Sequence, residues 1–126
     1  SSLSGVITPS STSSKILVMA SQTIQTYNAS GAYGTGRWKI IKTIGTTTTD
    51  VTNVGSTSNG NLLVYDYGTS GISVTRPASL IKLDAPNTTS EITYRTQAAM
   101  GSNGGSNLQL ADNLTTGTII LMEIAG

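Results

Sequence analysis

Short runs of alternating apolar and polar residues, separated by turn-forming residues, extend along almost the whole chain. The alternation is clearest at residues 91–100, where Ile92, Tyr94 and Ala98 are separated by polar side chains. A period of two is typical of a β-strand with one face toward a core, and no segment shows the 3.6-residue apolar period of a helix. The pattern predicts strands at residues 5–8, 15–27, 37–44, 61–67, 72–75, 79–83, 91–100, 107–111 and 117–124.

Two similar segments interrupt this pattern. Residues 9–15 are Pro-Ser-Ser-Thr-Ser-Ser-Lys, residues 86–91 are Pro-Asn-Thr-Thr-Ser-Glu, and a new alternating run follows each. Proline ends the strand before it, and hydroxyl and amide side chains bond to turn backbone. Asn-Gly pairs at residues 59–60 and 103–104 indicate hairpin turns. These segments therefore predict turns between consecutive strands.

Length and composition indicate one domain. The chain has 126 residues, 37% of them hydrophobic, with 17 serines and 21 threonines that suit turns and strands. Cysteine is absent, so no disulfide contributes. We predict that residues 1–126 form a single all-β domain, an antiparallel two-sheet β-sandwich that is jelly-roll-like and has about eight strands.

Two predicted strands are apolar on both faces. In residues 15–27, Ile16 and Val18 alternate with Leu17 and Met19, and residues 117–124 show the same feature. A loop or the first strand of the same chain is one candidate cover for the second face. We favour a subunit interface in a symmetric homo-oligomer, with the candidate residues Ile16, Leu17, Val18, Met19, Ile119 and Leu121. Lys15 and Glu123 at the strand margins discourage open-ended edge pairing.

Charge and hydropathy argue against two classes of partner. The formal net charge is +1, and there is no run of basic residues. We therefore expect no nucleic-acid partner and no polybasic membrane contact. The longest apolar runs are far shorter than a bilayer span, so we expect no membrane insertion and a soluble mature chain.

The residue inventory limits catalysis. Without histidine or cysteine, the chain has no Ser-His-Asp or Cys-His relay and no zinc site of the His or Cys type. A pair of carboxylates for glycoside hydrolysis is formally available among Asp50, Asp66, Asp84, Asp112, Glu91 and Glu123. Asp84 and Glu91 flank the Pro86 turn, where an Asp can bond to nearby backbone N–H groups. We predict structural roles for these acids, no enzymatic activity, and neither a metal nor a cofactor.

Aromatic residues are the candidate ligand contacts. Tyr33, Tyr65 and Tyr67 lie among Asn, Ser, Gly and Asp, a composition typical of recognition loops, and a saccharide could stack on such rings. The alternative for aromatic residues is packing, which we favour for Trp38 and Tyr94.

Three segments carry a family resemblance. They are residues 7–18 (ITPSSTSSKILV), residues 83–90 (LDAPNTTS) with Tyr94, and residues 119–124 (IILMEI). Together they resemble small virion structural proteins of tailed bacteriophages, including C-terminal modules of phage fibres. The resemblance implies a trimeric β-structure without enzymatic activity. It does not extend to residues 29–75, so no target specificity follows from it.

The resemblance leads to two virion functions and one alternative. The first predicted strand begins within ten residues of the start, and we expect a self-contained module rather than the tip of a long fibre. We therefore favour a homotrimeric capsid decoration or head-fibre protein on the virion surface, bound to capsid or fibre proteins. The second candidate is a tail-fibre tip that recognises a host surface glycan or protein. The third is a cell-surface carbohydrate-binding domain.

Overall fold

The computed structural model describes residues 2–28, 34–52, 62–66, 72–100, 106–110 and 117–126. These residues form nine strands in two antiparallel sheets and contain no helix, which confirms the predicted all-β class. No helix in this part of the chain is therefore long and apolar enough to cross a membrane.

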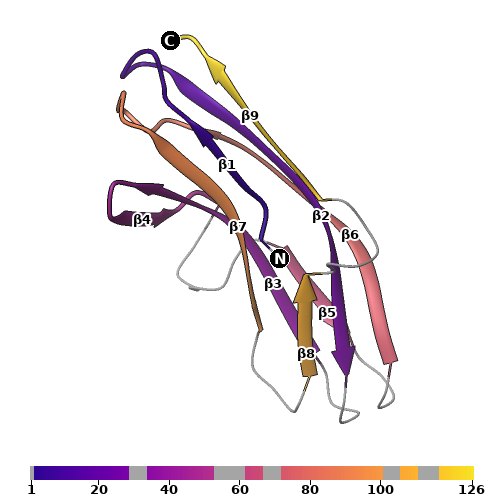
Figure 1. Ribbon diagram of the computed structural model, residues 1–126. Helices are drawn as coiled ribbons and strands as arrows, with labels where there is room; N and C mark the ends of the chain where they lie inside the picture. Colours follow the sequence, from indigo (N-terminus) through magenta and orange to yellow (C-terminus); the bar gives the residue numbers. More distant parts are fainter. Residues whose placement is uncertain (1, 29–33, 53–61, 67–71, 101–105, 111–116) are drawn as a thin grey trace.

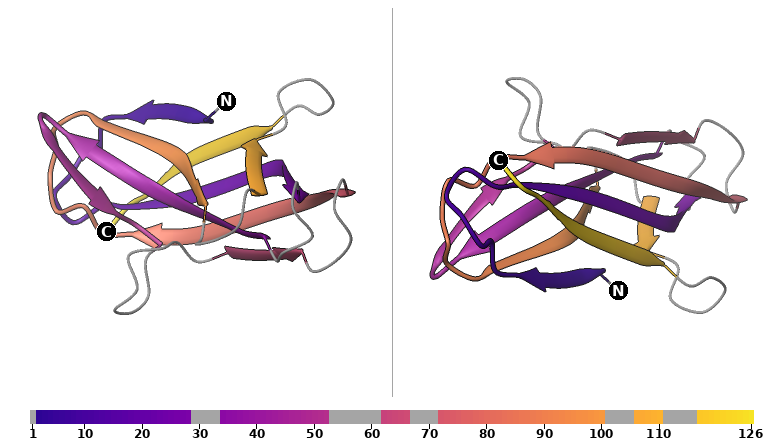
Figure 2. Two further views of the ribbon diagram at one scale, coloured as in Figure 1. Left: turned by 90° about the horizontal axis from the view of Figure 1, so that it is seen from below. Right: turned by 90° about the horizontal axis from the view of Figure 1, so that it is seen from above.

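The first sheet has five strands. Its order is β1 (Ser4–Ile7), β7 (Ile92–Met100), β3 (Gly34–Ile44) and β4 (Thr47–Asp50), and β5 (Leu62–Asp66) also pairs with β3. The second sheet has the order β6 (Ile72–Asp84), β2 (Lys15–Asn28) and β8 (Ser106–Leu110), and β9 (Thr118–Ile124) also pairs with β2. The two sheets form two layers, which are seen along their edges in Figure 2 and from the side in Figure 1.

Strand β2 organises the second sheet. One of its edges pairs with β6 from Ile16 to Asn28. Its other edge pairs with β9 at residues 15–21 and with β8 at residues 24–28. Two segments from the C-terminal quarter of the chain thus share one edge of a strand that begins at residue 15.

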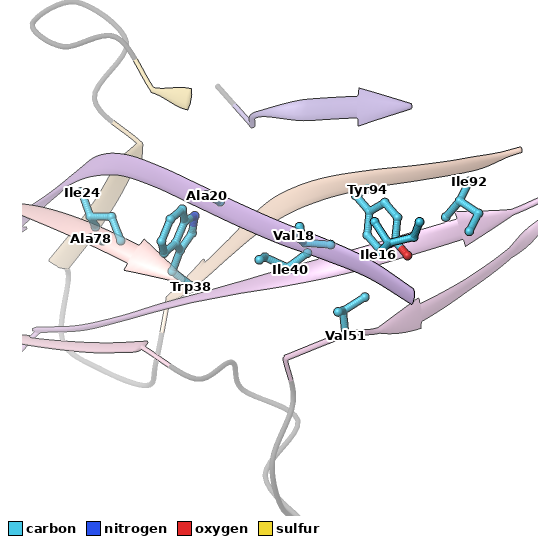
Figure 3. Packing of buried hydrophobic residues seen from close by; sticks show 10 residues of the cluster. All are labelled: Ile16, Val18, Ala20, Ile24, Trp38, Ile40, Val51, Ala78, Ile92 and Tyr94. Atoms are coloured by element: carbon cyan, nitrogen blue, oxygen red, sulfur yellow. The ribbon is translucent and has the colours of Figure 1, made fainter. Parts of the chain in front are cut away.

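The hydrophobic core lies between the sheets. Along β2 the even-numbered residues from Ile16 to Ala20 are buried, and Ile24 is buried as well. They face Trp38 and Ile40 of β3 and Ile92 and Tyr94 of β7 (Figure 3). Trp38 and Tyr94 are fully buried, which confirms the prediction that both rings pack in the interior. The indole N–H of Trp38 makes no hydrogen bond with any described residue.

The two proline segments form similar turns. In the first, the hydroxyl of Ser11, two residues after the proline, accepts a hydrogen bond from the N–H of Ser13 at 3.2 Å. In the second, the hydroxyl of Thr88, also two residues after the proline, accepts one from the N–H of Ser90 at 3.0 Å. Equivalent positions of both segments thus make the same side-chain-to-backbone turn. The predicted turn chemistry is confirmed.

One detail of the strand pattern was predicted wrongly. We expected separate strands at residues 72–75 and 79–83, but β6 continues through Pro77. Proline is tolerated there because, among the described strands, β6 pairs with β2 alone, and an edge strand does not need every N–H for pairing. Part of the Thr-rich stretch after Ile44 forms β4, which pairs with β3 through a turn whose Gly45 has a φ of 58°. The predicted Asn-Gly turns at residues 59–60 and 103–104 lie outside the described residues.

Candidate functional site

The outer face of the second sheet carries a patch of large apolar side chains. Residues paired directly across antiparallel strands point to the same face. Leu17 is paired with Leu83 on β6 and with Met122 on β9, which makes one row of three apolar residues. Met19 is paired in the same way with Ile81 and Ile120, which makes the next row.

These side chains are open to solvent. The exposed fractions are 69% for Ile81, 47% for Leu83, 46% for Ile120, 49% for Met122 and 40% for Ile124. Leu17 and Met19, in the middle of the rows, are half-buried by their neighbours. We call these seven residues the apolar face. Large apolar patches on folded proteins mark sites of interaction.

The apolar face ends abruptly on the same sheet. The next row along β2 is polar, because Ser21 is paired with Ser79 and with Thr118. The hydroxyl of Ser79 donates a hydrogen bond to that of Ser21 at 3.3 Å. In the row after that, Thr23 is paired with Pro77. The face is therefore bordered by polar residues at this end, as the core of a protein interface is at its rim.

The six predicted interface residues separate into three groups. Ile16 and Val18 are fully buried in the core of their own chain, so their prediction as interface residues is corrected. Ile119 and Leu121 are partly buried against the same core and face inward as well. Leu17 and Met19 do lie on the outer face. On β9 the outward residues are Ile120, Met122 and Ile124, which the prediction left out.

Behind this face, a group of polar side chains connects the two sheets. Asp84 at the end of β6 accepts hydrogen bonds from the Nζ of Lys42 on β3, at 3.0 Å to Oδ1 and 2.8 Å to Oδ2. The hydroxyl of Tyr94 on β7 donates to Oδ2 of the same carboxylate at 2.7 Å. Asp84 therefore has a structural role, as predicted, but through side chains of the other sheet rather than the backbone of its own turn.

The surroundings of Tyr94 keep its hydroxyl protonated. Burial raises the pKa of the Tyr94 hydroxyl far above its ordinary value, and the hydrogen bond to Asp84 and the charge of that carboxylate raise the pKa further. A neutral phenol is a hydrogen-bond donor and not a base. The Lys42, Asp84 and Tyr94 side chains satisfy one another, so the group acts as a tie between the sheets.

A second polar tie lies farther along the core. The hydroxyl of Thr96 on β7 donates to the side-chain oxygen of Gln22 on β2 at 3.2 Å, and both residues are buried. The same hydroxyl accepts a hydrogen bond from the N–H of Leu3 at 2.9 Å, and the N–H of Thr96 donates to the carbonyl of Leu3. This tie joins the two sheets and also holds the start of the chain.

Glu123 fastens the last strand to the first proline turn. Its Oε1 accepts hydrogen bonds from both the N–H and the hydroxyl of Ser10, each at 2.7 Å. The hydroxyls of Ser14 and Ser10 and the N–H of Ser10 hold the pKa of the Glu123 carboxyl below its ordinary value. We expected this residue to protect a strand edge, and the structure uses it to connect segments more than a hundred residues apart.

The predicted ligand tyrosines are not placed by the structure. Tyr33 and Tyr67 lie outside the described residues. The backbone of Tyr65 lies on β5, paired with Thr35 of β3, and its side chain also lies outside what is described.

Over the described ranges, no group of three or more His, Cys, Asp or Glu residues is arranged to hold a metal ion.

Ile81 and Leu83 of β6 belong to the apolar face but were not predicted as candidate site residues. Their alternation with Leu80 and Lys82 was visible in the sequence, but only their pairing with Met19 and Leu17 puts them on the apolar face.

No protein-family model, curated protein or solved structure matches the chain.

Proposed function

We propose that this chain is a non-enzymatic structural protein on the surface of a tailed-phage virion. In this proposal it is a homotrimeric capsid decoration (cement) or head-fibre protein, built as a jelly-roll-like β-sandwich. Its work is binding: it adds buried area between subunits of a shell or fibre.

The observation that carries the proposal is the apolar face. Seven large apolar side chains gather on the outside of one sheet, with polar residues at one end. Exposure of such a face to water is unfavourable for an isolated domain. A permanent assembly can bury it, because its interfaces are more apolar than the rest of the surface. Closed symmetry would bury it in every copy.

The polar ties support a binding role rather than a catalytic one. Lys42, Asp84 and Tyr94 form one group of ionisable side chains between the sheets, and each is bonded to another member of the group. The Tyr94 hydroxyl, whose pKa is raised, keeps its proton and donates to the carboxylate. A rigid two-sheet scaffold is what a shell component requires.

The segments that carry the phage resemblance lie together in space. Ile16 is paired with Asp84 on one side and with Glu123 on the other, and Glu123 is bonded to Ser10. Residues 7–18, 83–90 and 119–124 thus form one end of the molecule, near the C-terminus in Figure 1. This contiguity supports treating the three segments as one structural unit rather than as three chance likenesses.

Protein mass spectrometry on purified particles tests the proposal. Virions of a tailed phage that encodes this sequence are expected to contain the chain, at hundreds of copies per particle, with antibody labelling on the head. A few copies confined to the tail would support the fibre tip instead. Absence from purified particles would remove both virion functions.

A further inference from the structure

We propose that the apolar face of β6, β2 and β9 packs against the same face of other copies of this chain, with the three faces of a homotrimer meeting around its threefold axis. The inference rests on the proposed function, because it names the surface through which that assembly forms. It also replaces the interface expected from the sequence: the contact residues are Leu17, Met19, Ile81, Leu83, Ile120, Met122 and Ile124.

The size of the face suits such a contact. At the exposed fractions given above, its five open side chains present on the order of 500 Å², comparable to the largest apolar patch of an ordinary monomer. The half-buried Leu17 and Met19 and the polar border of Ser21, Ser79 and Thr118 extend it. The whole face then approaches one side of a specific protein interface, about 600 to 800 Å².

The charge of the face favours a copy of itself over a charged partner. Lys82 and Glu123 alternate with the face residues along their strands, so they belong to the other side of the sheet. Lys15, at one end of β2, is the one charged residue on the rows that form the face. Two such faces meet without opposed carboxylates, and a nucleic acid or an acidic partner finds no basic surface here.

The shape of the face also fits self-association. Six of its side chains stand in two rows across three adjacent strands, and Ile124 lies in the next row, beside Lys15. Apolar sheet faces pack on one another with interdigitated side chains. Three such faces can therefore meet around one axis and bury one another.

The first strand does not cover this face. A Cβ placed on Gly5 of β1 would meet Leu121 at 3.0 Å, and one placed on Gly117 would contact Leu3. Leu121 belongs to the inward side of β9, so the N-terminal segment packs on the opposite side of this strand from Ile120 and Met122. The first strand, one of the two covers that the sequence suggested, therefore lies on the inner side.

Sedimentation velocity on paired variants tests the inference. We expect the unaltered chain to sediment as an oligomer at micromolar concentration. Ile81→Lys combined with Met122→Lys should raise the dissociation constant at least 100-fold and yield monomer. The matched control is Val6→Lys, because Val6 is an apolar side chain of the other sheet with 57% exposure, and this variant should remain oligomeric. An unaltered chain that is monomeric, or an oligomer that survives both lysines, would overturn the inference.

A second measurement does not depend on how lysines affect folding. The chain contains no cysteine, so a single introduced thiol is the only one present. The thiol of Ile120→Cys should react slowly with a bulky maleimide in the oligomer and several-fold faster after dilution to monomer. The thiol of Val6→Cys should react at the same rate in the oligomer and in the diluted monomer. Equal rates for both thiols, at concentrations where the chain is an oligomer, would place the interface elsewhere.

The outcomes also separate this inference from the proposed function. A chain that self-associates through the apolar face but is absent from virions refutes the virion function and leaves the inference standing. A chain present in virions but monomeric in solution, with Ile120→Cys freely reactive, refutes the inference alone. Flotation of the monomer with phosphatidylcholine vesicles would show that a lipid surface occupies the face, and would likewise overturn the inference.

Discussion

Tyr94 on β7 donates a 2.7 Å hydrogen bond to Oδ2 of Asp84 at the end of β6, and this bond joins one sheet to the other. The same oxygen lies 2.8 Å from the Nζ of Lys42 on β3. One carboxylate thus connects three strands that belong to two sheets. Tyr94 is fully buried and the Asp84 side chain is 13% exposed, so the bond is partly shielded from competing water.

Removing the Tyr94 hydroxyl should lower the stability of the fold. In Tyr94→Phe, Asp84 keeps Lys42 but loses a hydrogen bond to a charged group, which contributes about 1.5 to 3 kcal/mol to the free energy of unfolding. Urea denaturation measures the loss. The matched control is Tyr27→Phe, because Tyr27 is exposed and its change should shift the midpoint little. Equal effects of the two substitutions would show that the tie does not contribute to stability.

Lys42 and Tyr94 should be energetically coupled through Asp84. Each donates to the same carboxylate, so the loss of one hydrogen bond changes how much the other contributes to the free energy of unfolding. A double-mutant cycle of Lys42→Met and Tyr94→Phe should give an interaction energy of about 0.5 to 3 kcal/mol in urea denaturation. Strict additivity of the two changes would contradict a shared carboxylate.

The fold should lose stability in alkali because of Tyr94. The pKa of its hydroxyl is raised in the folded state, so above pH 10, its ordinary pKa, the unfolded chain releases this proton first. The contribution of Tyr94 is complete below that pH and declines as the pH rises toward the folded-state pKa. Thermal denaturation between pH 9 and 11 should show a steeper decline for the unaltered chain than for Tyr94→Phe. Parallel curves would contradict the assignment.

Glu123 should make the fold sensitive to acid. Its pKa is lowered in the folded state, so its contribution is complete above the ordinary value of 4.5 and is lost as the pH falls through the folded-state pKa. Glu123→Gln should therefore flatten the fall of the melting temperature between pH 5 and pH 3.

Glu91→Gln is the matched control for this change, because Glu91 is an exposed carboxylate beside the second proline turn. It should leave the acid profile close to that of the unaltered chain. If Glu123→Gln gave the same profile as the control, the bonds from Ser10 would not stabilise the carboxylate of Glu123.

Local signals in the sequence were sufficient to predict most of the strands and turns. The period of two located β7, short apolar runs located β2 and β9, and the proline segments located the turns, because all of these signals depend on residues close together in the chain. Pro77 misled the prediction because its effect depends on whether β6 has a neighbour on its outer edge. That property belongs to the sheet and not to the segment.

The residues of the candidate site likewise divide into features that local sequence signals show and features that depend on the sheet. The sequence by itself determined that β2 and β9 are apolar on both faces, since consecutive apolar residues in a strand point to opposite faces. It did not determine which face of β9 is outward, because alternation is symmetric when both faces are apolar. Only the tertiary structure decided that, by pairing Leu17 with Met122 and with Leu83, residues about a hundred and about sixty-six positions away in the chain. The joining of Asp84 to Lys42 and Tyr94 was decided in the same way, because contacts between sheets depend on how the layers pack.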